Sequence, residues 1–585
     1  MVNIKIDKQS VSVREGSTIL EAAATVGIEI PTLCYLKDFC EAGACRMCAV
    51  EIEGDGKLST ACNTKAENGM VIHTNSCRAR EARRVNLELI LSAHDNNCPS
   101  CVRSGNCSLQ TLAENLNIPE IPYDRKYTPR EWPQDYPLIR NDSKCIKCMR
   151  CISVCNTVQS LGVWDTRDSA ARLTVDVAGG GAIEKSACAL CGQCVTHCPV
   201  GALIARDDTE KVLDALSDPN KVVIVQIAPA VRTAWGEDVG LGREEATVGR
   251  MAAAVRALGA DYVFDTNFSA DLTIMEEGSE LLQRLSNKES YSWPMFTSCC
   301  PGWVRFLKSQ YPELLSNLST AKSPQQMVGA VAKTWFASRT GIDPEKIFCV
   351  SIMPCMAKKH ECTLPGMDGA KTGQDVDAVI TSRELGRMLR ACHINAPKLA
   401  EEDFDDILGE GTGAAVIFGA TGGVMEAALR SAYYLVTGKN PDPDGFSAVR
   451  GMSGYREVTA ELDGIPVRAA VASGLANARE IIEKVKSGEA AYDFVEIMAC
   501  PGGCVGGGGQ PITDGKELAT ERAPVLYGLD QSAAIRFSHE NPSVAKAYEE
   551  FFEKPLSHKS HELLHTTQDF LDISLTPCIK VKALS

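Results

Sequence analysis

The 585-residue chain lacks the features of several protein classes. No apolar run reaches the roughly 18 residues that a membrane-spanning helix needs. The first residues, MVNIKIDKQSVSV, alternate like a β-strand and lack the charged and then apolar build of a signal peptide. Basic residues are the minority, 60 against 75 acidic ones, and the net charge of −15 argues against a general nucleic-acid binder. We therefore expect a cytoplasmic protein with no membrane span.

Nucleotide-binding signals are also missing. We find no convincing G-x-G-x-x-G after a predicted strand, no P-loop and no recognisable flavin site. Chemistry on NAD(P) or flavin would therefore need partner chains. Hydrophobic residues make up 44% of the chain, which is enough for folded cores and excludes a disordered protein.

Cysteine, in contrast, is abundant. The chain has 26 cysteines, and a long chain without an export signal is not a disulfide-stapled miniprotein. A reducing compartment keeps such thiols free or bound to metal, and their regular spacing favours metal.

The first cysteine group lies in a predicted β-grasp [2Fe–2S] ferredoxin-like domain, residues 1–76. Two alternating runs, Val2–Ile6 and Ser10–Val13, precede a capping box at Thr18 and a short helix to about Val26. A C-x10-C-x2-C-x13-C pattern suits a [2Fe–2S] cluster, because its long first gap differs from the paired spacings of zinc ribbons. Cys40 fits no register and is predicted to be a plain loop thiol. The expected ligands are Cys34, Cys45, Cys48 and Cys62.

Residues 77–140 are predicted to form a second cluster domain and a linker. A helical stretch from Arg83 to Leu91 precedes three cysteines at cluster spacing that lack a fourth partner. A lone histidine is more often structural, but His94 stands four residues before the first of them. We expect a His/Cys3 [4Fe–4S] cluster, whose neutral imidazole tends to raise the potential. The segment 118–141, rich in Pro, Trp and Tyr, is predicted to be a linker. The expected ligands are His94, Cys98, Cys101 and Cys107.

Residues 141–208 contain an internal repeat, in which C-x2-C-x2-C-x3-C occurs twice. This is the pattern of a two-[4Fe–4S] bacterial ferredoxin domain, where the fourth cysteine of each run ligates the other cluster. One cluster is expected on Cys145, Cys148, Cys151 and Cys198, and the other on Cys188, Cys191, Cys194 and Cys155. One [2Fe–2S] and three [4Fe–4S] clusters form an electron relay that must lead to a further site.

The rest of the chain is predicted to be a large α/β domain, residues 209–525. Short β-branched runs alternate with helical stretches, which favours largely parallel sheets. Sites in such sheets form beyond the carboxyl ends of strands. The predicted buried β-runs are 222–229, 262–266, 294–300, 347–355, 415–423 and 494–504.

Four cysteines stand at the ends of these runs, namely Cys300, Cys355, Cys500 and Cys504. Widely spread in sequence, they would enclose a cluster from several sides of one cavity. The alternative is that they are buried structural thiols, a common state of cysteine. We expect that state for Cys349, Cys362, Cys392 and Cys578, with Cys77 a further spare thiol.

These segments closely resemble the catalytic domain of [FeFe]-hydrogenases. Three cysteine motifs of that family occur in order as FTSCCPGWVRF (296–306), IMPCMAKKHE (352–361) and EIMACPGGCVGGGGQP (496–511). FSADLTIMEEGSE (268–280), AKSPQQM (321–327) and IFGATGGVMEAALR (417–430) extend the resemblance. It covers essentially the whole chain and is greatest to catalytic subunits of cytoplasmic multi-subunit, NADP-reducing or electron-bifurcating hydrogenases.

The resemblance implies a cofactor, the H-cluster. Cys300, Cys355, Cys500 and Cys504 would hold its [4Fe–4S] part, and Cys504 would bridge to a two-iron subsite that carries CO, cyanide and an azadithiolate. Lys358 would donate to a cyanide ligand; the alternative is a solvated surface charge like Lys359. The other residues that the resemblance assigns to the cofactor are backbone donors around Pro229, Pro324 and Gln325, and the walls Met353, Phe418 and Met498.

One position departs from the family. Ala230 stands where many relatives have serine. If that hydroxyl normally donates to a cyanide, this chain lacks the bond, and the potential or catalytic bias of its cluster is shifted.

Turnover of H2 also needs a proton relay, whose members must lie within hydrogen-bond reach of one another, directly or through water. The family's path maps onto Cys299, a bound water, Glu277, Ser319 and Glu280, with Arg284 near the exit. Glu277 and Glu280 share one face of a helix predicted over Asp271 to Leu285. Without the resemblance, they would be ordinary solvated acids.

Residues 526–585 are predicted to be a helical segment that resembles the small subunit of other members, with Asn541-Pro542 starting one helix. The expected partners are flavin- and NAD(P)-binding subunits, and ferredoxin is a further candidate. The alternatives are a stand-alone ferredoxin-dependent hydrogenase, a complex I-like relay subunit without catalysis and an H2 sensor. The motifs after residue 296 argue against a pure relay, and Cys299 argues against a sensor.

Overall fold

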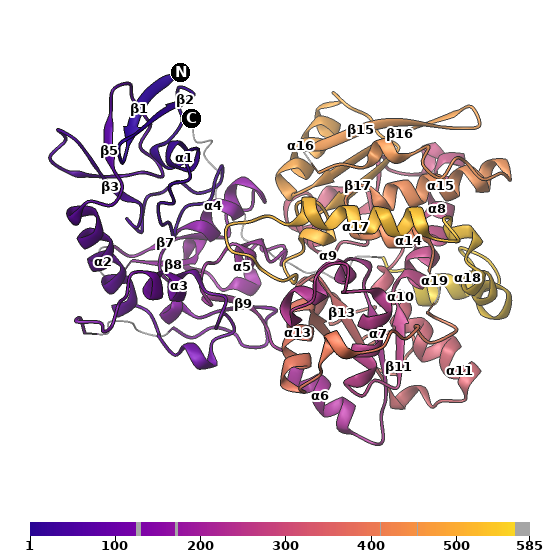
Figure 1. The fold of residues 1–585 in the computed structure, drawn as a ribbon. Coiled ribbons are helices and arrows are strands. Elements are labelled where there is room, and N and C mark those ends of the chain that lie inside the picture. The colour runs from indigo at the N-terminus through magenta and orange to yellow at the C-terminus, as the bar shows by residue number, and fades with distance from the viewer. Residues whose placement is uncertain (125–129, 170–172, 410, 453, 568–585) are drawn as a thin grey trace.

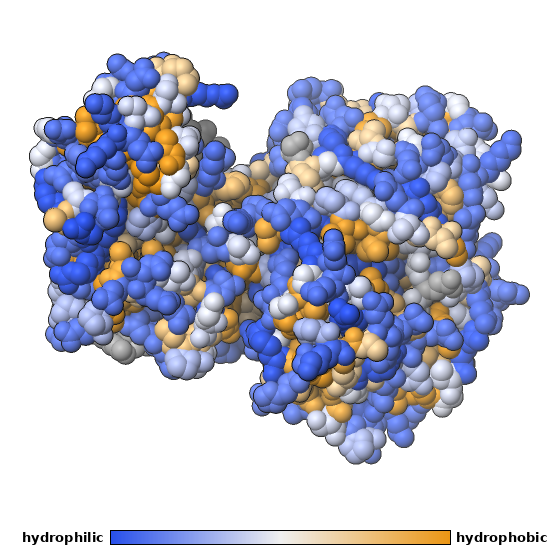
Figure 2. All heavy atoms as spheres, viewed as in Figure 1, coloured by the Kyte–Doolittle hydropathy of each residue, from blue (hydrophilic) through white to orange (hydrophobic). Residues whose placement is uncertain are grey.

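The computed structural model describes residues 1–124, 130–169, 173–409, 411–452 and 454–567, and shows two lobes (Figure 1). The N-terminal lobe contains the elements up to β9, and the larger lobe contains the rest. In the space-filling view the lobes meet at a narrower waist, and their visible face is mainly hydrophilic (Figure 2). None of the helices in the described ranges is long and apolar enough to cross a membrane. Cys578 lies outside these ranges.

The first 76 residues fold around a five-stranded sheet of order β2-β1-β5-β3-β4. β1 buries Val2, Ile4 and Ile6 and exposes the residues between them, as its alternating sequence predicts. The predicted capping box is confirmed, because Thr18 and Glu21 each accept a hydrogen bond from the other's backbone amide. The elements are β1 (Val2–Ile6), β2 (Gln9–Val13), α1 (Ile19–Ala24), β3 (Ala49–Ile52), β4 (Leu58–Thr60) and β5 (Val71–His73).

Residues 77–208 form the second part of the N-terminal lobe. The helix predicted from Arg83 begins six residues earlier, at Cys77, because Ser76 caps it by accepting from the Ala79 amide. The predicted linker ends in β6, which pairs antiparallel with β9. The elements are α2 (Cys77–Ser92), α3 (Ser108–Asn115), β6 (Leu138–Arg140), α4 (Arg150–Thr157), β7 (Trp164–Arg167), β8 (Thr174–Val177), α5 (Gln193–Thr196) and β9 (Leu203–Ala205).

The larger lobe contains two four-stranded sheets, as the α/β prediction requires. One is fully parallel, with the order β11-β10-β13-β14; the other, β12-β17-β16-β15, is parallel except for β15. Helices α7 and α13 share a buried core with the first sheet, and α8 and α15 share one with the second.

The elements of this lobe before the C-terminal segment are α6 (Thr209–Ser217), β10 (Val222–Ile227), α7 (Val248–Ala257), β11 (Tyr262–Asp265), α8 (Asn267–Ser286), β12 (Met295–Phe296), α9 (Pro301–Gln310), α10 (Pro324–Val331), α11 (Ala337–Thr340), β13 (Ile347–Met353), α12 (Lys358–Glu361), β14 (Ala378–Thr381), α13 (Ser382–Ala391), α14 (Gly413–Val416), α15 (Gly423–Thr437), β15 (Tyr455–Leu462), β16 (Ile465–Ser473), α16 (Leu475–Ser487) and β17 (Phe494–Met498).

One predicted strand is wrong. Residues 415–423 form the end of α14, a 3-10 turn over Ile417–Gly419 and the start of α15. Thr412 starts this helical path by accepting from the Ala415 amide. The turn is tight enough that a Cβ on Gly423 would lie 1.8 Å from the Ile417 carbonyl oxygen. Apolar periodicity cannot separate a short buried strand from a short buried helix, which explains the error.

The C-terminal segment is helical and packs on the larger lobe. α17 (Ala519–Ser532) contacts α14, and α19 (His558–Leu564) contacts α10. α18 (Pro542–Ala547) begins as predicted, since the Asn541 side chain accepts from the amides of Ser543 and Val544.

Candidate active site

A cavity of about 90 Å³ lies beyond the carboxyl ends of β10, β12, β13 and β17. Cys300 follows β12, Cys355 follows β13, and Cys500 and Cys504 follow β17. All four line the cavity, although more than 200 residues separate the first from the last. The seven residues predicted to contact the cofactor also line it, namely Pro229, Ala230, Pro324, Gln325, Met353, Phe418 and Met498.

The chemistry of this cavity fits a cationic metal group. Burial and the neighbouring Cys300 raise the pKa of Cys355 to about 11. Burial also raises the pKa of Cys500 and of Cys504, and the neighbouring thiols add to the effect. Thiols this crowded become thiolates only when a bound cation offsets their mutual repulsion. The four side chains and their apolar surroundings therefore suit an iron–sulfur group.

Glycine backbone shapes one wall of the cavity. Gly503 has φ of 90°, and a Cβ there would lie 2.6 Å from the Thr421 amide nitrogen. A Cβ on Gly507 would lie 2.1 Å from the Pro354 carbonyl oxygen. Only glycine allows this close approach, which lets the loop that carries Cys504 close over the cavity.

Lys358 lies in the cavity wall with its charge paired. Its Nζ donates to Glu361 Oε2 at 2.9 Å and to the Cys299 carbonyl oxygen at 3.1 Å. Burial lowers the pKa of Lys358, but Glu361 and the thiols of Cys355 and Cys299 outweigh it, so the pKa lies above its usual value. The side chain is therefore a cation facing the cavity.

Lys359 is not the solvated neighbour that the sequence suggested. Its side chain is fully buried, and its Nζ donates to Asp208 at 2.6 Å and to Glu384 at 2.9 Å. The two adjacent lysines therefore differ in role: Lys358 faces the cavity, and Lys359 ties α12 to α13. Cys392 is a second correction, because it is exposed, whereas Cys349 and Cys362 are buried as expected.

A row of buried polar groups leads away from Cys299. Burial, reinforced by Glu280, raises the pKa of Glu277 to about 8. Ser319 lies beside Glu277 and donates to Glu280 Oε2 at 2.8 Å. Arg284 then donates to Glu280 Oε1 at 2.5 Å and lies over the ring of Tyr291, which is 37% exposed. The row therefore connects the cavity wall to the surface.

The sequence missed some residues of this region. Glu361, the partner of Lys358, stands three residues later on the same helix, a spacing that could have indicated the pair. The backbone amide of Thr320 donates to both oxygens of Glu280, and no sequence pattern indicates it.

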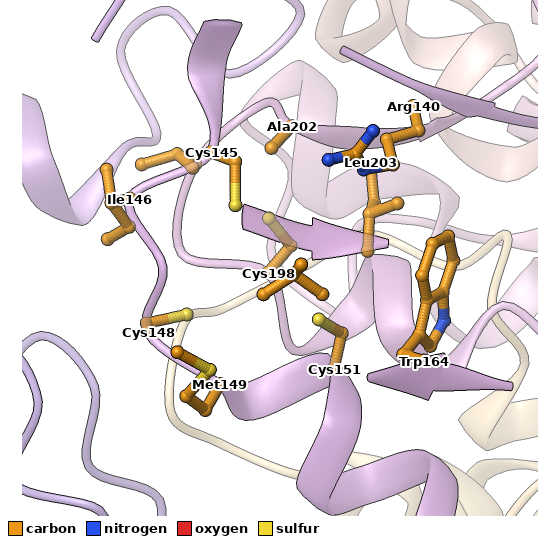
Figure 3. A pocket seen from close by; sticks show the side chains of 12 residues that line it. Arg140, Cys145, Ile146, Cys148, Met149, Cys151, Trp164, Cys198, Ala202 and Leu203 are labelled. Carbon is orange, nitrogen blue, oxygen red and sulfur yellow. The ribbon is translucent and has the colours of Figure 1, made fainter. Parts of the chain in front are cut away.

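The internal repeat folds into two cysteine-lined cavities. Figure 3 shows Cys145, Cys148, Cys151 and Cys198 with their sulfur atoms turned toward one another. The second cavity is lined by Cys155, Cys188, Cys191 and Cys194. Each run thus contributes its fourth cysteine to the other cavity, which is the exchange that the spacing predicts.

The other two cysteine groups lie in the first and second domains. In the first domain, Cys34 lies beside Cys45, and Cys48 lies beside Cys62. In the second, His94 is buried, and its Nδ1 lies 3.0 Å from the Lys144 carbonyl oxygen. A carbonyl only accepts, so the proton sits on Nδ1 and Nε2 is left with a lone pair for a metal.

Two contacts link these groups to the repeat. Cys107 Sγ lies 3.8 Å from the Pro199 carbonyl oxygen, and Cys40 Sγ lies 3.6 Å from that of Cys148. Cys40 is therefore a buried packing thiol between domains rather than a plain loop thiol. In the described part of the chain, no group of three or more His, Cys, Asp or Glu side chains is placed to hold a single metal ion.

Comparison with known families agrees with this arrangement. The family described as "Iron only hydrogenase large subunit, C-terminal domain" matches residues 221–508, and "Iron hydrogenase small subunit" matches 516–567. Three iron–sulfur families match the N-terminal lobe: "2Fe-2S iron-sulfur cluster binding domain" at 1–77, "NADH-ubiquinone oxidoreductase-G iron-sulfur binding region" at 83–122 and "4Fe-4S dicluster domain" at 144–202.

Similar proteins cover nearly the whole chain. The NADP-reducing hydrogenase subunit HndD of Solidesulfovibrio fructosivorans is 48% identical over 97% of this chain and 98% of its own length. Iron hydrogenase 1 of Clostridium pasteurianum is 40% identical over 97% and 99%. The solved structure of an apo [FeFe]-hydrogenase HydA1 variant from Chlamydomonas reinhardtii is 44% identical, with a TM-score of 0.55 over 62% of this chain and 98% of that one. The chain belongs to the iron-only, or [FeFe], hydrogenase family.

Proposed function

We propose that this chain is the catalytic subunit of an NAD(P)-linked [FeFe]-hydrogenase, which interconverts H2 with protons and electrons. The observation that most strongly supports this proposal is one cavity. It is lined by Cys300, Cys355, Cys500 and Cys504 together with Cys299 and Lys358. In this proposal Cys300, Cys355, Cys500 and Cys504 would hold an H-cluster in this cavity. When bound, that group supplies the iron chemistry that splits and forms H2.

The protein positions the group and keeps water away from it. Met353, Phe418 and Met498 form apolar walls, and Lys358 presents a cation to an anionic ligand such as cyanide. The Glu361 carboxylate holds the Lys358 ammonium in place. The Ala230 side chain has no hydroxyl that could donate a hydrogen bond to the cofactor. The proposed donors are therefore Lys358 and the backbone near Pro229, Pro324 and Gln325.

Protons are proposed to move between Cys299 and the surface through Glu277, Ser319 and Glu280. A pKa of about 8 lets Glu277 both hold and release a proton near neutral pH. The Ser319 hydroxyl can accept from one carboxyl while it donates to the other. Arg284 holds the Glu280 carboxylate in place at the end of the path where protons would leave for the surface.

Electrons are proposed to pass through four clusters in the N-terminal lobe. The proposed units are residues 1–76 with the β-grasp [2Fe–2S] domain, 77–140 with the His/Cys3 cluster, 141–208 with the two [4Fe–4S] clusters, 209–525 with the H-cluster and 526–585 with the small-subunit-like segment. Cys500 Sγ lies 3.6 Å from the Cys191 carbonyl oxygen, which supports the second ferredoxin cluster as the neighbour of the catalytic site.

Beyond the first ferredoxin cluster the relay branches. The contact of Cys40 with Cys148 leads to the [2Fe–2S] domain, and that of Cys107 with Pro199 leads to the His/Cys3 domain. Two branches give two docking points for donors or acceptors. We propose that flavin- and NAD(P)-binding subunits dock at one of them; the name of the Solidesulfovibrio relative, an NADP-reducing hydrogenase subunit, supports a partner that handles NADP. Ferredoxin at the other would allow electron bifurcation; the alternative is a stand-alone ferredoxin-dependent enzyme.

The test is purification of the native protein with whatever accompanies it. We expect infrared bands of CO and cyanide in the matured protein, and H2-dependent reduction of NADP or NAD only in the presence of partner chains. Absence of the infrared bands would exclude the hydrogenase proposal. Full reduction of ferredoxin by H2 without partners would exclude an obligate complex.

A further inference from the structure

One arginine lies against the site expected for the His/Cys3 cluster. Arg103 belongs to the loop 102–106, which joins two expected ligands, Cys101 and Cys107, and it is only 7% exposed. A Cβ built on Gly201 would lie 2.8 Å from Cys101 Sγ and 3.7 Å from Arg103 Cγ, so the arginine stem and this sulfur pack on the same stretch of backbone. Burial raises the pKa of the Cys107 thiol, and the nearby Arg103 charge opposes that rise. Arg103 is therefore a neighbour of both thiols.

The terminal nitrogens of Arg103 lack partners among the described residues. Its Nε donates to the Asn106 carbonyl oxygen at 2.7 Å, whereas Nη1 and Nη2 are shielded from solvent and have no acceptor. Arg305, which is similarly buried, has a partner for each of its three nitrogens. A buried guanidinium with two unpaired nitrogens is costly. Because neither nitrogen reaches solvent, a dissolved anion cannot supply the acceptor, which must be held inside the protein.

The expected cluster is an acceptor of this kind. Its four expected ligands are His94, Cys98, Cys101 and Cys107. Three thiolates and one neutral imidazole leave a [4Fe–4S] cluster negatively charged, and its sulfur atoms accept hydrogen bonds. The unpaired nitrogens of Arg103 and these sulfur acceptors therefore complement each other in charge and in hydrogen bonding.

We propose that Arg103 donates through Nη1 and Nη2 to sulfur atoms of the His/Cys3 cluster and raises its reduction potential. This inference rests on the proposed cluster and adds a residue that tunes it. Reduction adds one electron to a group that is already anionic, so a fixed cation beside it stabilises the reduced form more than the oxidised form. The electron enters the cluster, no covalent bond of Arg103 changes, and the guanidinium keeps its proton throughout.

The effect of Arg103 adds to that of the histidine ligand. A neutral imidazole in place of a thiolate also raises the potential. Both features make the second domain a more favourable place for an electron that arrives from the first ferredoxin cluster past the contact of Cys107 with Pro199. Arg103 thus helps to determine how electrons divide between the two branches of the relay.

The test is a redox titration of the cluster-loaded protein followed by electron paramagnetic resonance, with iron content measured in parallel. His94→Cys identifies the signal, because it changes the ligands of this cluster alone. In Arg103→Gln we expect the equilibrium constant for reduction of this cluster to fall at least about tenfold, which lowers the midpoint potential by about 59 mV. Iron content should stay at the parent value. The shift should be the same at slightly acidic and slightly alkaline pH, because arginine does not titrate there.

Two further variants complete the test. Arg103→Lys keeps the charge but not the two-pronged donor, serves if the glutamine variant loses the cluster, and should lower the same equilibrium constant severalfold. Arg80→Gln is the matched control, since this exposed arginine of α2 donates to the Asn75 carbonyl oxygen, and it should keep the parent potential.

Equal potentials in the parent and in every Arg103 variant that holds the cluster would overturn the role of Arg103, as would an equal shift in Arg80→Gln. A parent protein without any signal that His94→Cys alters would overturn the proposed cluster itself.

Discussion

Ser319 donates a hydrogen bond of 2.8 Å to Glu280 Oε2, and its side chain also lies beside Glu277. One serine side chain thus lies next to two carboxyl groups that stand three residues apart on α8. Both carboxyl groups are buried, although acidic residues on a helix are usually solvated. Burial raises the pKa of Glu277 to about 8, so this carboxyl can hold or release a proton near neutral pH.

The first prediction concerns Glu277→Gln, which keeps size and hydrogen bonding but removes the titrating proton. We expect H2 turnover to fall roughly 100-fold or more, because a relay member is lost. The H-cluster infrared spectrum should remain. Glu280→Gln is expected to act in the same direction, whereas Glu289→Gln, at an exposed position in the 3-10 turn after α8, should turn over normally.

The same substitution has a predicted effect on stability. Below the usual pKa of 4.5, Glu277 is protonated in both the folded and unfolded chains. Between 4.5 and about 8 only the unfolded chain releases its proton, so the stability of the parent protein falls as pH rises, by up to about 5 kcal/mol. Glutamine has no such loss. The melting temperature of Glu277→Gln relative to the parent should therefore rise from pH 5 to pH 8, and a constant difference would contradict the raised pKa.

The adjacent cysteines give a second prediction. We expect Cys299→Ala to keep the cofactor, measured by iron content and infrared bands, and to lose at least about 100-fold in turnover. Cys300→Ala should instead fail to hold the cofactor, because it removes one of four expected ligands. Cys77→Ala, an exposed thiol, is the control and should match the parent. Normal turnover of Cys299→Ala would show that the proton takes another path.

Cysteine spacing is a local and specific signal, so the sequence alone could group the cysteines into proposed cluster sites. Spacing alone predicted the exchange of Cys155 and Cys198 between the two repeats, and two cavities of the fold are lined by the cysteines grouped in this way. The family resemblance placed Met353, Phe418 and Met498 around one cavity, which apolar periodicity could not, since such residues also fill cores.

The sequence could not show which side chains are buried by contacts with distant segments. Lys359 differs from Lys358 only by one position, and its burial depends on Asp208 and Glu384, which come from distant segments. The helix at 415–423 depends on a cap at Thr412 and on close backbone packing of Gly423, neither of which an apolar pattern reports. Both errors arose where tertiary contacts, rather than local pattern, decide the structure.

Lys359 provides a third prediction. In Lys359→Met the buried Glu384 loses its only ion-pair partner among the described residues, and Asp208 loses one of two. Leaving a buried charge unpaired costs about 3–5 kcal/mol. We expect a clear fall in the melting temperature of the protein. Lys371→Met, on an exposed ion pair with Asp368, should change it little. An unchanged melting temperature in Lys359→Met would mean that the two carboxylates do not carry charge.

The final prediction tests whether the C-terminal segment supports the proton row. His565 Nε2 lies 3.0 Å from Glu276 Oε2, and its Nδ1 lies 2.8 Å from Thr320 Oγ1. The Thr320 amide in turn binds Glu280.

We expect His565→Ala to destabilise the protein by about 1–3 kcal/mol, because buried polar groups lose their partner. Since Thr320 is then less fixed, turnover should also fall severalfold, with the H-cluster infrared bands unchanged. His558→Ala, on the exposed side of α19, is the control for both thermal melting and H2 turnover. If His565→Ala lowered the melting temperature but left turnover intact, the segment would stabilise the fold without positioning Glu280.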